Sequence, residues 1–283
     1  PYLPLIPEGF LFVVFVGLGS ILANLTSWLF RQPAEVADWQ AVAGNEDKVA
    51  VVTGATSGIG LAVARGLLRA GYGTLIMPVR EAACKGSWVA DHLQREFPQS
   101  HIHGLQCNLG HPAEIEQALQ QITNNFKRLD LLVLNAGCYR GGWEENERGW
   151  EWQMAVNYYG HVQLAAGLIP LLRATQKAGN QTRILVNMSP AYHCVYRLRP
   201  DDPAQFGRLS SYCQSKYALM LFTHRLATLL GPEQIRVNAF MPGLVHTNIF
   251  YHDWLTAPLM RWTSTFFPWL FAKPEEAAIT ALW

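Results

Sequence analysis

The sequence lacks the features that mark several common classes of protein. Its net charge is +1 at pH 7 and it has no block of basic residues, so a nucleic-acid-binding surface is not expected as its main function. The cysteines are odd in number and never stand in C-x-x-C spacing, which argues against a disulfide framework and against a zinc site. We interpret them as reduced thiols, at Cys84, Cys107, Cys138, Cys194 and Cys213. With 50% hydrophobic residues among 283, the chain can build the core of one large α/β domain.

Charge is also absent from one long stretch near the N-terminus. Residues 10–30 are mostly apolar and uncharged, and about 20 such residues suffice to cross a bilayer. A buried helix or a cleavable signal sequence would be apolar too, but signal cores are shorter and no small-residue cleavage site follows Phe30. We therefore expect a transmembrane helix at about 10–30, within an N-terminal membrane anchor of residues 1–31. Arg31 favours a cytosolic location for the rest of the chain, and residues 32–47 form a polar connector.

A strand, a glycine-rich turn and a helix follow the connector. Residues 48–53 are rich in valine, as in a buried parallel strand, and residues 61–70 have a helical pattern. Glycines between them let the backbone turn tightly and approach a pyrophosphate, which would bind at the helix N-terminus. The alternative is a glycine-rich loop without a ligand, which the flanking strand and helix disfavour. The expected cofactor contacts here are Gly54, Thr56, Ser57, Gly58, Ile59 and Gly60.

The next strand, around residues 73–77, brings residue 80 to the place where an adenosine ribose would bind. An acidic residue there would bind the 2′-hydroxyl of NAD(H), but the chain has Arg80. A guanidinium suits a 2′-phosphate, so NADP(H) is favoured as the cofactor. The neighbouring Glu81 keeps NAD(H) as an alternative.

Strands and helices continue to alternate along the chain. We expect helices around residues 87–97, 112–126 and 147–172, and strands around residues 101–107, 129–134, 183–186 and 234–240. This alternation predicts an α/β fold, a Rossmann-like doubly wound parallel sheet with helices on both faces. Ligands of such sheets bind at the carboxyl ends of the strands, where we place Gly54, Asn135, Ser189 and Pro242.

Tyr212 and Lys216 stand four residues apart in a segment with helical periodicity, so they share one face of a helix. A nearby cation favours the phenolate, and such a pair can transfer a proton near neutral pH. The alternative is an amphipathic helix with an ordinary surface lysine. The pair alone does not decide between the two.

Together these motifs resemble the short-chain dehydrogenase/reductase family. In the family's order the chain has Thr53-Gly-x-x-x-Gly-x-Gly60, Asn135-Ala-Gly137, Asn157, Ser189, Tyr212-x-x-x-Lys216, and Pro242-Gly243 with Thr247. The resemblance covers residues 48 to about 250. Within the family, the sequence is most similar to the retinol-dehydrogenase-like branch, including its polyprenol-acting members.

The resemblance implies a role for each of four catalytic residues. Tyr212 would exchange a proton with the substrate oxygen while a hydride moves to or from the nicotinamide. Lys216 would hold the nicotinamide ribose and lower the pKa of the tyrosine. Ser189 would hydrogen-bond the substrate oxygen, and Asn157 would place a water molecule in the proton relay.

The resemblance also extends the set of cofactor contacts. Two departures from the family pattern matter here: Met188 and Pro190 flank Ser189, where the family usually has serine and a small residue, which affects the loop of that catalytic serine, and Asn108 stands where an aspartate usually meets the adenine. The further contacts expected are Asn108, Leu109, Asn135, Ala136, Gly137, Tyr212, Lys216, Pro242, Gly243, Val245 and Thr247.

The function implied is that of a membrane-anchored NADP(H)-dependent oxidoreductase. It would interconvert a lipophilic alcohol, such as a polyprenoid, a retinoid or a steroid, with its aldehyde or ketone. We expect the anchor to lie in the endoplasmic reticulum or another intracellular membrane, and family members often pair as homodimers. Two alternatives remain: a non-catalytic NADPH-binding subunit of a membrane complex, and a lipid-binding module.

An apolar, aromatic segment at residues 248–273 would form a lid over the substrate within a catalytic domain of residues 48–283. Its tryptophans suit a membrane interface, although the same aromatics could instead complete the hydrophobic core. Because the resembled fold adds one more strand at the sheet edge, we expect this domain to continue beyond Trp283.

Overall fold

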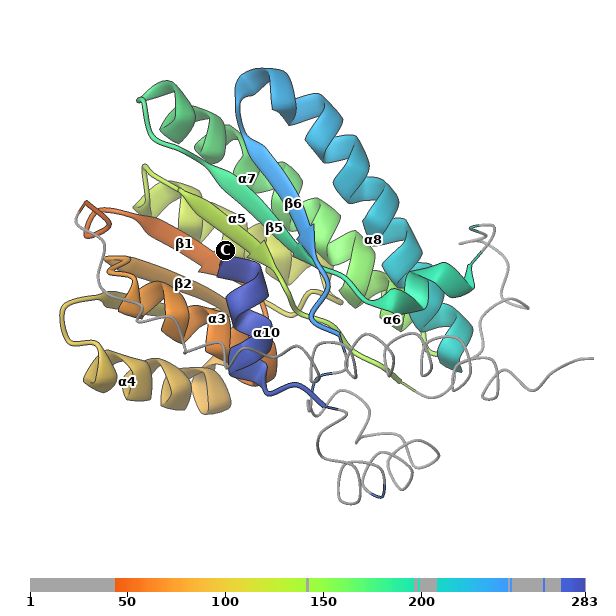
Figure 1. The fold of residues 1–283 in the computed structure, drawn as a ribbon. Coiled ribbons are helices and arrows are strands. Elements are labelled where there is room, and N and C mark those ends of the chain that lie inside the picture. The colour runs from red at the N-terminus through yellow and green to blue at the C-terminus, as the bar shows by residue number, and fades with distance from the viewer. Residues whose placement is uncertain are drawn as a thin grey trace, which may run out of the picture.

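Six strands form one parallel sheet in the described part of the chain, in the order β3-β2-β1-β4-β5-β6 (Figure 1). The computed structural model describes residues 44–140, 143–195, 198, 208–243, 245, 262 and 271–282. The strands are β1 (Val49–Val52), β2 (Thr74–Val79), β3 (His101–Gln106), β4 (Leu131–Leu134), β5 (Arg183–Asn187) and β6 (Arg236–Phe240). The order reverses between β1 and β4, which places a topological switch point at their carboxyl ends.

Helices cover both faces of the sheet, as predicted (Figure 1). One face is covered by α3 (Gly58–Arg69), α4 (Ser87–Glu96) and α10 (Pro274–Leu282), and the other by α5 (Pro112–Asn125), α7 (Gly160–Lys177) and α8 (Arg208–Leu230). Successive residues of β1 enter opposite cores: Val49 and Val51 pack toward α5 and α7, whereas Ala50 and Val52 pack toward α3 and α4. This period of two explains why the strand is apolar throughout.

The helix predicted around residues 147–172 begins later and ends later than expected. It consists of α6 (Trp152–Met154), a π-helical turn η3 (Ala155–Tyr159) and α7, which runs to Lys177. Asn146 prevents the earlier start, because its side-chain oxygen accepts the main-chain N–H groups of Arg148 and Trp150 at 3.0 Å each and holds them in a turn. Glu151 then caps the helix by accepting the N–H of Met154.

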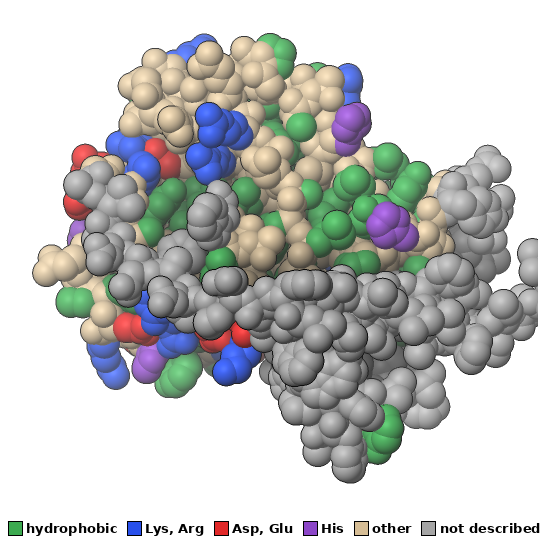
Figure 2. Space-filling view, viewed as in Figure 1, with side chains coloured by type: hydrophobic (Ala, Val, Ile, Leu, Met, Phe, Trp, Pro, Cys, Tyr) green, Lys and Arg blue, Asp and Glu red, His purple; other side chains and the backbone are tan. Residues whose placement is uncertain are grey.

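Three shorter elements complete the described chain. They are η2 (Ala82–Gly86), η4 (Pro190–Cys194) and η6 (Gly231–Glu233). On the face drawn in Figure 2, basic side chains are dispersed and hydrophobic side chains reach the surface between them.

Several predictions concern residues outside the described part. The transmembrane helix at 10–30, the rest of the anchor and most of the connector lie there, as do Thr247 and most of the lid at 248–273. Among the residues that the structure describes, no helix combines the length and the apolar character needed to cross a bilayer.

Candidate active site

Tyr212, Lys216 and Ser189 meet beside the carboxyl end of β5. Tyr212 and Lys216 lie on one face of α8, with the lysine Nζ 5.9 Å from the centroid of the tyrosine ring. The Tyr212 hydroxyl shares a side-chain hydrogen bond with Ser189, which begins η4. Lys216 Nζ donates to the main-chain oxygen of Asn187, the last residue of β5, at 3.1 Å. The predicted pairing of tyrosine and lysine on one helical face is therefore present in the fold.

Asn157 connects to the same cluster from the π-helical turn η3. It is fully buried, and its Nδ2 donates to Ser215 Oγ and to the main-chain oxygen of Cys138, both at 3.0 Å. Its Oδ1 accepts the N–H of Cys138 at 2.8 Å. The Ser215 hydroxyl in turn donates to the main-chain oxygen of Tyr212 at 2.8 Å. Asn157 thus ties the loop after β4 to the helix that carries Tyr212.

Burial dominates the ionisation of the tyrosine and lysine. It raises the pKa of Tyr212 to about 12, and the hydrogen bond with Ser189 acts in the opposite direction. It lowers the pKa of Lys216 to about 8, because an ammonium loses its hydration inside the protein. We expected Lys216 to lower the tyrosine pKa. In the structure the pKa of Tyr212 lies above its ordinary value, because burial removes the hydration that a phenolate needs.

The unusual neighbours of Ser189 leave its hydroxyl available to the site. Pro190 occupies the first position of η4, where its missing N–H has no helical partner to lose. Ser189 Oγ accepts the N–H of Ala191 at 3.3 Å and also reaches Tyr212. Met188 is buried in the core between the sheet and α7. The Met-Ser-Pro sequence is thus compatible with the predicted position of the serine.

The glycine turn adopts a conformation that requires glycine at two positions. Gly54 and Gly58 have φ angles of +67° and +54°, in the left-handed region. At Gly60 a Cβ atom would overlap the main-chain oxygen of Gly54. Ser57, the N-cap of α3, makes no side-chain capping hydrogen bond within the described structure, so its side chain leaves the first N–H groups of the helix uncapped. A phosphate group fits such an arrangement.

A ladder of amides links the carboxyl ends of β1, β4 and β5. Asn135 Nδ2 donates to the main-chain oxygen of Thr53 at 3.0 Å, and Asn187 Nδ2 donates to Asn135 Oδ1 at 2.9 Å. A main-chain oxygen can only accept, so Thr53 determines the orientation of both side-chain amides. Asn187 Oδ1 is then left buried with no hydrogen-bond donor among the described residues. A buried acceptor of this kind fits a donor on a bound ligand.

The predicted adenosine contacts differ from one another in exposure and in hydrogen bonding. Arg80 follows β2 directly, and its side chain is 63% exposed and forms an ion pair with Glu81 at 3.4 Å. Asn108 lies just after β3, where its Oδ1 accepts the N–H of Gly110 at 3.1 Å. Leu109 is buried in the core between the sheet and α7, which gives it a packing role as well. Arg80 and Asn108 lie at the carboxyl edge of the sheet, as predicted.

The remaining predicted contacts lie near the same edge. Ala136 donates its N–H to Thr53 Oγ1 at 3.0 Å, and Gly137 follows it. Pro242 and Gly243 follow β6, and Val245 forms an isolated parallel bridge with Ala272. Thr56 and Ile59 are half-buried in the glycine turn.

Four residues of the cluster were not singled out as site residues from the sequence. They are Thr53, His161, Asn187 and Ser215. Sequence spacing could have indicated two of them, because Thr53 directly precedes the glycine turn and His161 stands one helical turn after Asn157.

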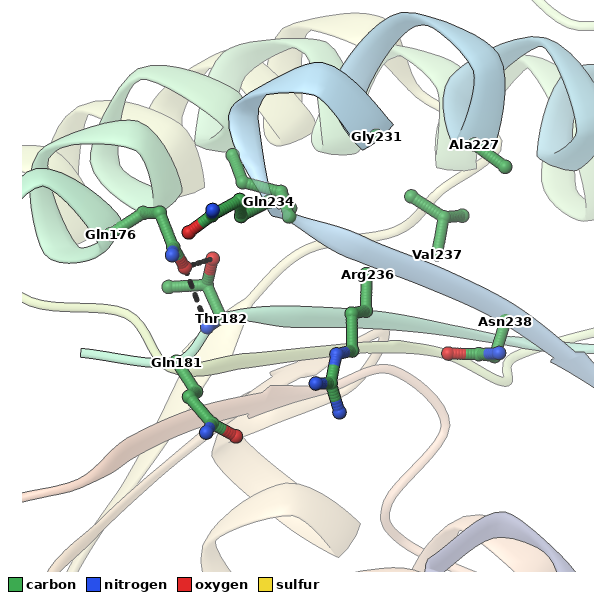
Figure 3. A pocket seen from close by; sticks show the side chains of 10 residues that line it. Gln176, Gln181, Thr182, Ala227, Gly231, Gln234, Arg236, Val237 and Asn238 are labelled. Atoms are coloured by element: carbon green, nitrogen blue, oxygen red, sulfur yellow. Dashed lines mark hydrogen bonds between the residues drawn. The ribbon is translucent and has the colours of Figure 1, made fainter. Parts of the chain in front are cut away.

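A separate hollow of about 630 Å³ opens at the other end of the sheet, near the amino ends of β5 and β6 (Figure 3). Its rim includes Gln176, whose Oε1 accepts from the N–H and the hydroxyl of Thr182 at 3.1 and 2.9 Å. Arg236 and Asn238 of the edge strand β6 also line it. The hollow lies away from Tyr212 and is not part of the candidate active site.

Comparisons with known proteins agree with this geometry. The family model of short chain dehydrogenases matches residues 48–255. Polyprenol dehydrogenase of Homo sapiens is 32% identical over 84% of this chain and 72% of its own length, and retinol dehydrogenase 14 of Homo sapiens is 32% identical over 83% and 73%. The RhlG/NADP active-site complex of Pseudomonas aeruginosa superposes with a TM-score of 0.66 at 27% identity, covering 87% of this chain and 90% of that one. The chain belongs to the short-chain dehydrogenase family and is an oxidoreductase.

Proposed function

We propose that the protein uses NADP(H) to interconvert a lipophilic alcohol with its aldehyde or ketone, with Tyr212 as the proton-transferring residue. The observation that carries this proposal is the hydrogen bond between Tyr212 and Ser189, with Lys216 on the same helical face as the tyrosine. A hydroxyl pair of this kind can hold a carbonyl or alcohol oxygen while a proton is exchanged. We assign Lys216 to the same site because it donates to the main-chain oxygen of Asn187, and Asn157 because it donates to the Ser215 hydroxyl, which donates to the main-chain oxygen of Tyr212.

Three features support the fit of a dinucleotide. The glycine turn is tight enough that a Cβ atom at Gly60 would overlap the main-chain oxygen of Gly54, and a tight turn of this kind before a helix suits a pyrophosphate. The buried Asn187 Oδ1 offers an acceptor to a ligand donor. Arg80 stands after β2 with an exposed guanidinium, which suits a 2′-phosphate, and the named NADP complex of RhlG supports the same choice.

When bound, the nicotinamide would supply or accept the hydride. The protein's own groups would handle the proton. With a pKa of about 12, Tyr212 is protonated at neutral pH and can donate its proton to a carbonyl oxygen held by Ser189. Lys216, with a pKa of about 8, is largely charged at pH 7 and would stabilise the phenolate left behind.

The lipophilic substrate and the membrane are proposed from the sequence together with the relatives. Residues 10–30 and the aromatic segment at 248–273 are suited to an anchor and to a lid at a bilayer interface. The relatives' names, polyprenol dehydrogenase and retinol dehydrogenase 14, support a long isoprenoid alcohol as the substrate. A lid held against the membrane would let such a lipid enter the cleft without crossing water.

The test is turnover by the full chain reconstituted in liposomes. With NADPH and a long-chain isoprenoid aldehyde, we expect alcohol formation, and with NADP⁺ and the alcohol the reverse reaction. Tyr212→Phe removes the phenolic hydroxyl, and with it the transferable proton and the hydrogen bond with Ser189, so it should lower kcat by roughly 10²–10⁴-fold while NADPH binding and Tm stay close to those of the parent. NADPH binding without turnover of any lipid or short aldehyde would instead indicate a non-catalytic subunit.

A further inference from the structure

His161 forms a bridge behind the candidate site. It lies in the first turn of α7, is fully buried, and makes a hydrogen bond with each ring nitrogen. Nδ1 lies 3.1 Å from the main-chain oxygen of Asn157, and Nε2 lies 3.1 Å from Thr53 Oγ1. One side chain thus joins the end of β1, beside the glycine turn, to the residue that ties Cys138 to Ser215.

The partners of His161 determine its tautomer. The main-chain oxygen of Asn157 can only accept, so Nδ1 carries the hydrogen and Nε2 accepts. The Thr53 hydroxyl then donates to Nε2 at 3.1 Å, the nearer of two acceptors, since the main-chain oxygen of Val133 lies at 3.3 Å. Its two lone pairs receive the N–H groups of Asn135 and Ala136 at 2.8 and 3.0 Å. Every hydrogen-bonding position of that hydroxyl is used.

The same contacts keep His161 neutral. A protonated ring would add a third donor to a Thr53 oxygen that has only two lone pairs. Burial acts in the same direction and lowers the pKa of His161 to about 4. The bridge therefore has one direction of hydrogen bonding, from Thr53 through the imidazole to Asn157, across the pH range in which most enzymes work.

The helix around Asn157 is locally irregular. The N–H of Gly160 bonds to the main-chain oxygen of Ala155, five residues earlier, which is a π-type turn. The side chain of Asn157 is already occupied by Cys138 and Ser215. The His161 ring adds a side-chain hydrogen bond to the main-chain oxygen of Asn157 in this irregular stretch.

We propose that His161 is a positioning residue for the reaction: through its Nδ1–H it fixes the main-chain oxygen of Asn157, and through Nε2 it couples that oxygen to Thr53 and the glycine turn. Because the ring is fully buried and both its nitrogens are bonded to the protein, it would act through Asn157 and not by direct contact with the substrate. The proposal rests on the function proposed above, because it takes Asn157 as part of the proton-transfer machinery.

Two substitutions separate the two bonds of the ring. The amide of asparagine falls near the place of Nδ1, and the amide of glutamine near that of Nε2. His161→Asn keeps a donor toward Asn157 and loses the bond to Thr53, whose hydroxyl has the main-chain oxygen of Val133 at 3.3 Å as another acceptor. His161→Gln keeps an acceptor for Thr53 and loses the donor to Asn157.

The experiment compares kcat and the KM for NADPH of both variants with the parent in liposomes. We expect His161→Gln to lower kcat about tenfold, the value of one lost hydrogen bond of about 1.4 kcal/mol, with the KM for NADPH within about twofold. His161→Asn, which keeps the donor to Asn157 but loses the coupling to Thr53, should lose clearly less kcat than His161→Gln, about threefold at most. If both variants lost kcat equally and in step with their Tm values, His161 would only fill the core. The same conclusion would follow if neither variant lost kcat.

A measurement on the parent avoids any dependence on folding of the variants. In full-length protein labelled with ¹⁵N-histidine, His161 should show the neutral Nδ1–H tautomer from about pH 5 to pH 8, and it should not titrate. An Nε2–H tautomer, or titration within that range, would overturn the bridge. Lack of turnover by the parent would contradict the proposed function and, with it, the positioning role, whereas the tautomer would still report on the bridge itself.

Discussion

At the scale of single residues, the candidate site is organised by hydrogen bonds that are already made. Thr53 donates to His161 and accepts from two main-chain N–H groups, and Asn157 uses its whole side-chain amide on Cys138 and Ser215. Lys216 donates one hydrogen bond to the main-chain oxygen of Asn187. Residues held in this way lose little conformational freedom when a reaction begins, which is what a preorganised site requires.

The buried lysine should make stability depend on pH. Its pKa is lowered from 10.5 to about 8, so below pH 8 the folded protein bears the full cost of a buried ammonium. Between about pH 8 and 10.5 the unfolded chain binds more protons than the folded one, and this group's contribution to stability rises with pH. Lys216→Met removes the ammonium and loses one hydrogen bond, so at pH 7 its Tm should be a few degrees above that of the parent.

The check is the difference in Tm between Lys216→Met and the parent from about pH 7 to pH 9.5. We expect this difference to shrink as pH rises, because the parent alone loses the buried charge. Lys85→Met, at an exposed position in η2, is the matched control and should follow the parent. A difference that stays constant over this range would show that the ammonium is not destabilised by burial.

Cofactor preference should depend on the pair formed by Arg80 and Glu81. Arg80→Asp removes the cation and repels a 2′-phosphate, so the KM for NADPH should rise about 10–100-fold and the preference should move toward NADH. Glu81→Gln removes the carboxylate that now pairs with the guanidinium at 3.4 Å, so it should lower the KM for NADPH modestly. Arg95→Asp, the same charge change at an exposed position of α4, should change neither KM. Unaltered NADPH affinity in Arg80→Asp would show that another residue binds the phosphate.

The sequence predicted the residues proposed to carry out the reaction better than the residues that hold them in place. Tyr212 and Lys216 could be paired from their spacing alone, because four residues on a helix always share a face. Asn187 could not be linked to Asn135 in this way. Their contact depends on β5 lying beside β4 in the observed register, which pairs Val186 with Leu134. The raised pKa of Tyr212 was missed for a similar reason, since burial is a property of the folded molecule.

At the scale of elements, the alternation of strands and helices was predicted and is confirmed, with most bounds within a few residues. Apolar runs and helical periodicity suffice for this because a doubly wound sheet buries its central strands on both faces. The exception is the start of the helix before α7. There the side-chain oxygen of Asn146 accepts hydrogen bonds from two main-chain N–H groups, so the helix begins only at Trp152. Such local competition depends on a side-chain conformation that periodicity does not reveal.

The turn between β1 and α3 provides a prediction at this scale. Gly60→Ala would place a methyl group on the main-chain oxygen of Gly54 and on Asn135 Nδ2, so both the turn and the amide ladder must shift. We expect a loss of about 1–3 kcal/mol of stability and a rise in the Kd for NADPH of at least about tenfold. Gly231→Ala in η6 is the matched control, because no described atom lies within 4 Å of its added Cβ.

Isothermal titration with NADPH and thermal unfolding measure both effects. Gly231→Ala should bind NADPH as the parent does and unfold at the same temperature or slightly higher. If Gly60→Ala lost stability but bound NADPH with unchanged affinity, the glycine turn would be a structural feature without a role in cofactor binding.

At the scale of the whole molecule, the strand order brings together residues that are far apart in the chain. β1 lies between β2 and β4, so Thr53, Asn135 and Asn187 meet at one edge although more than a hundred residues separate the first from the last. Gly58, Arg80 and Gly243 follow strands of the same sheet at that edge. A parallel sheet directs all its carboxyl ends to one side, which is why a site could be expected there from the alternation alone.

The last prediction concerns how the whole molecule would meet its substrate at a membrane. Trp262, in the segment proposed as a lid, is 54% exposed, and an exposed indole is suited to the bilayer interface. Trp262→Ser should therefore raise the apparent KM for a long-chain isoprenoid aldehyde in liposomes several-fold, while the KM for a short water-soluble aldehyde stays within about twofold, because only the long substrate must leave the bilayer. Trp88 on α4 is 67% exposed and supplies the control for loss of a surface indole, so Trp88→Ser should change neither KM. Equal rises for the long and the short substrate in Trp262→Ser would show that this tryptophan supports the fold of the site and does not contact the membrane.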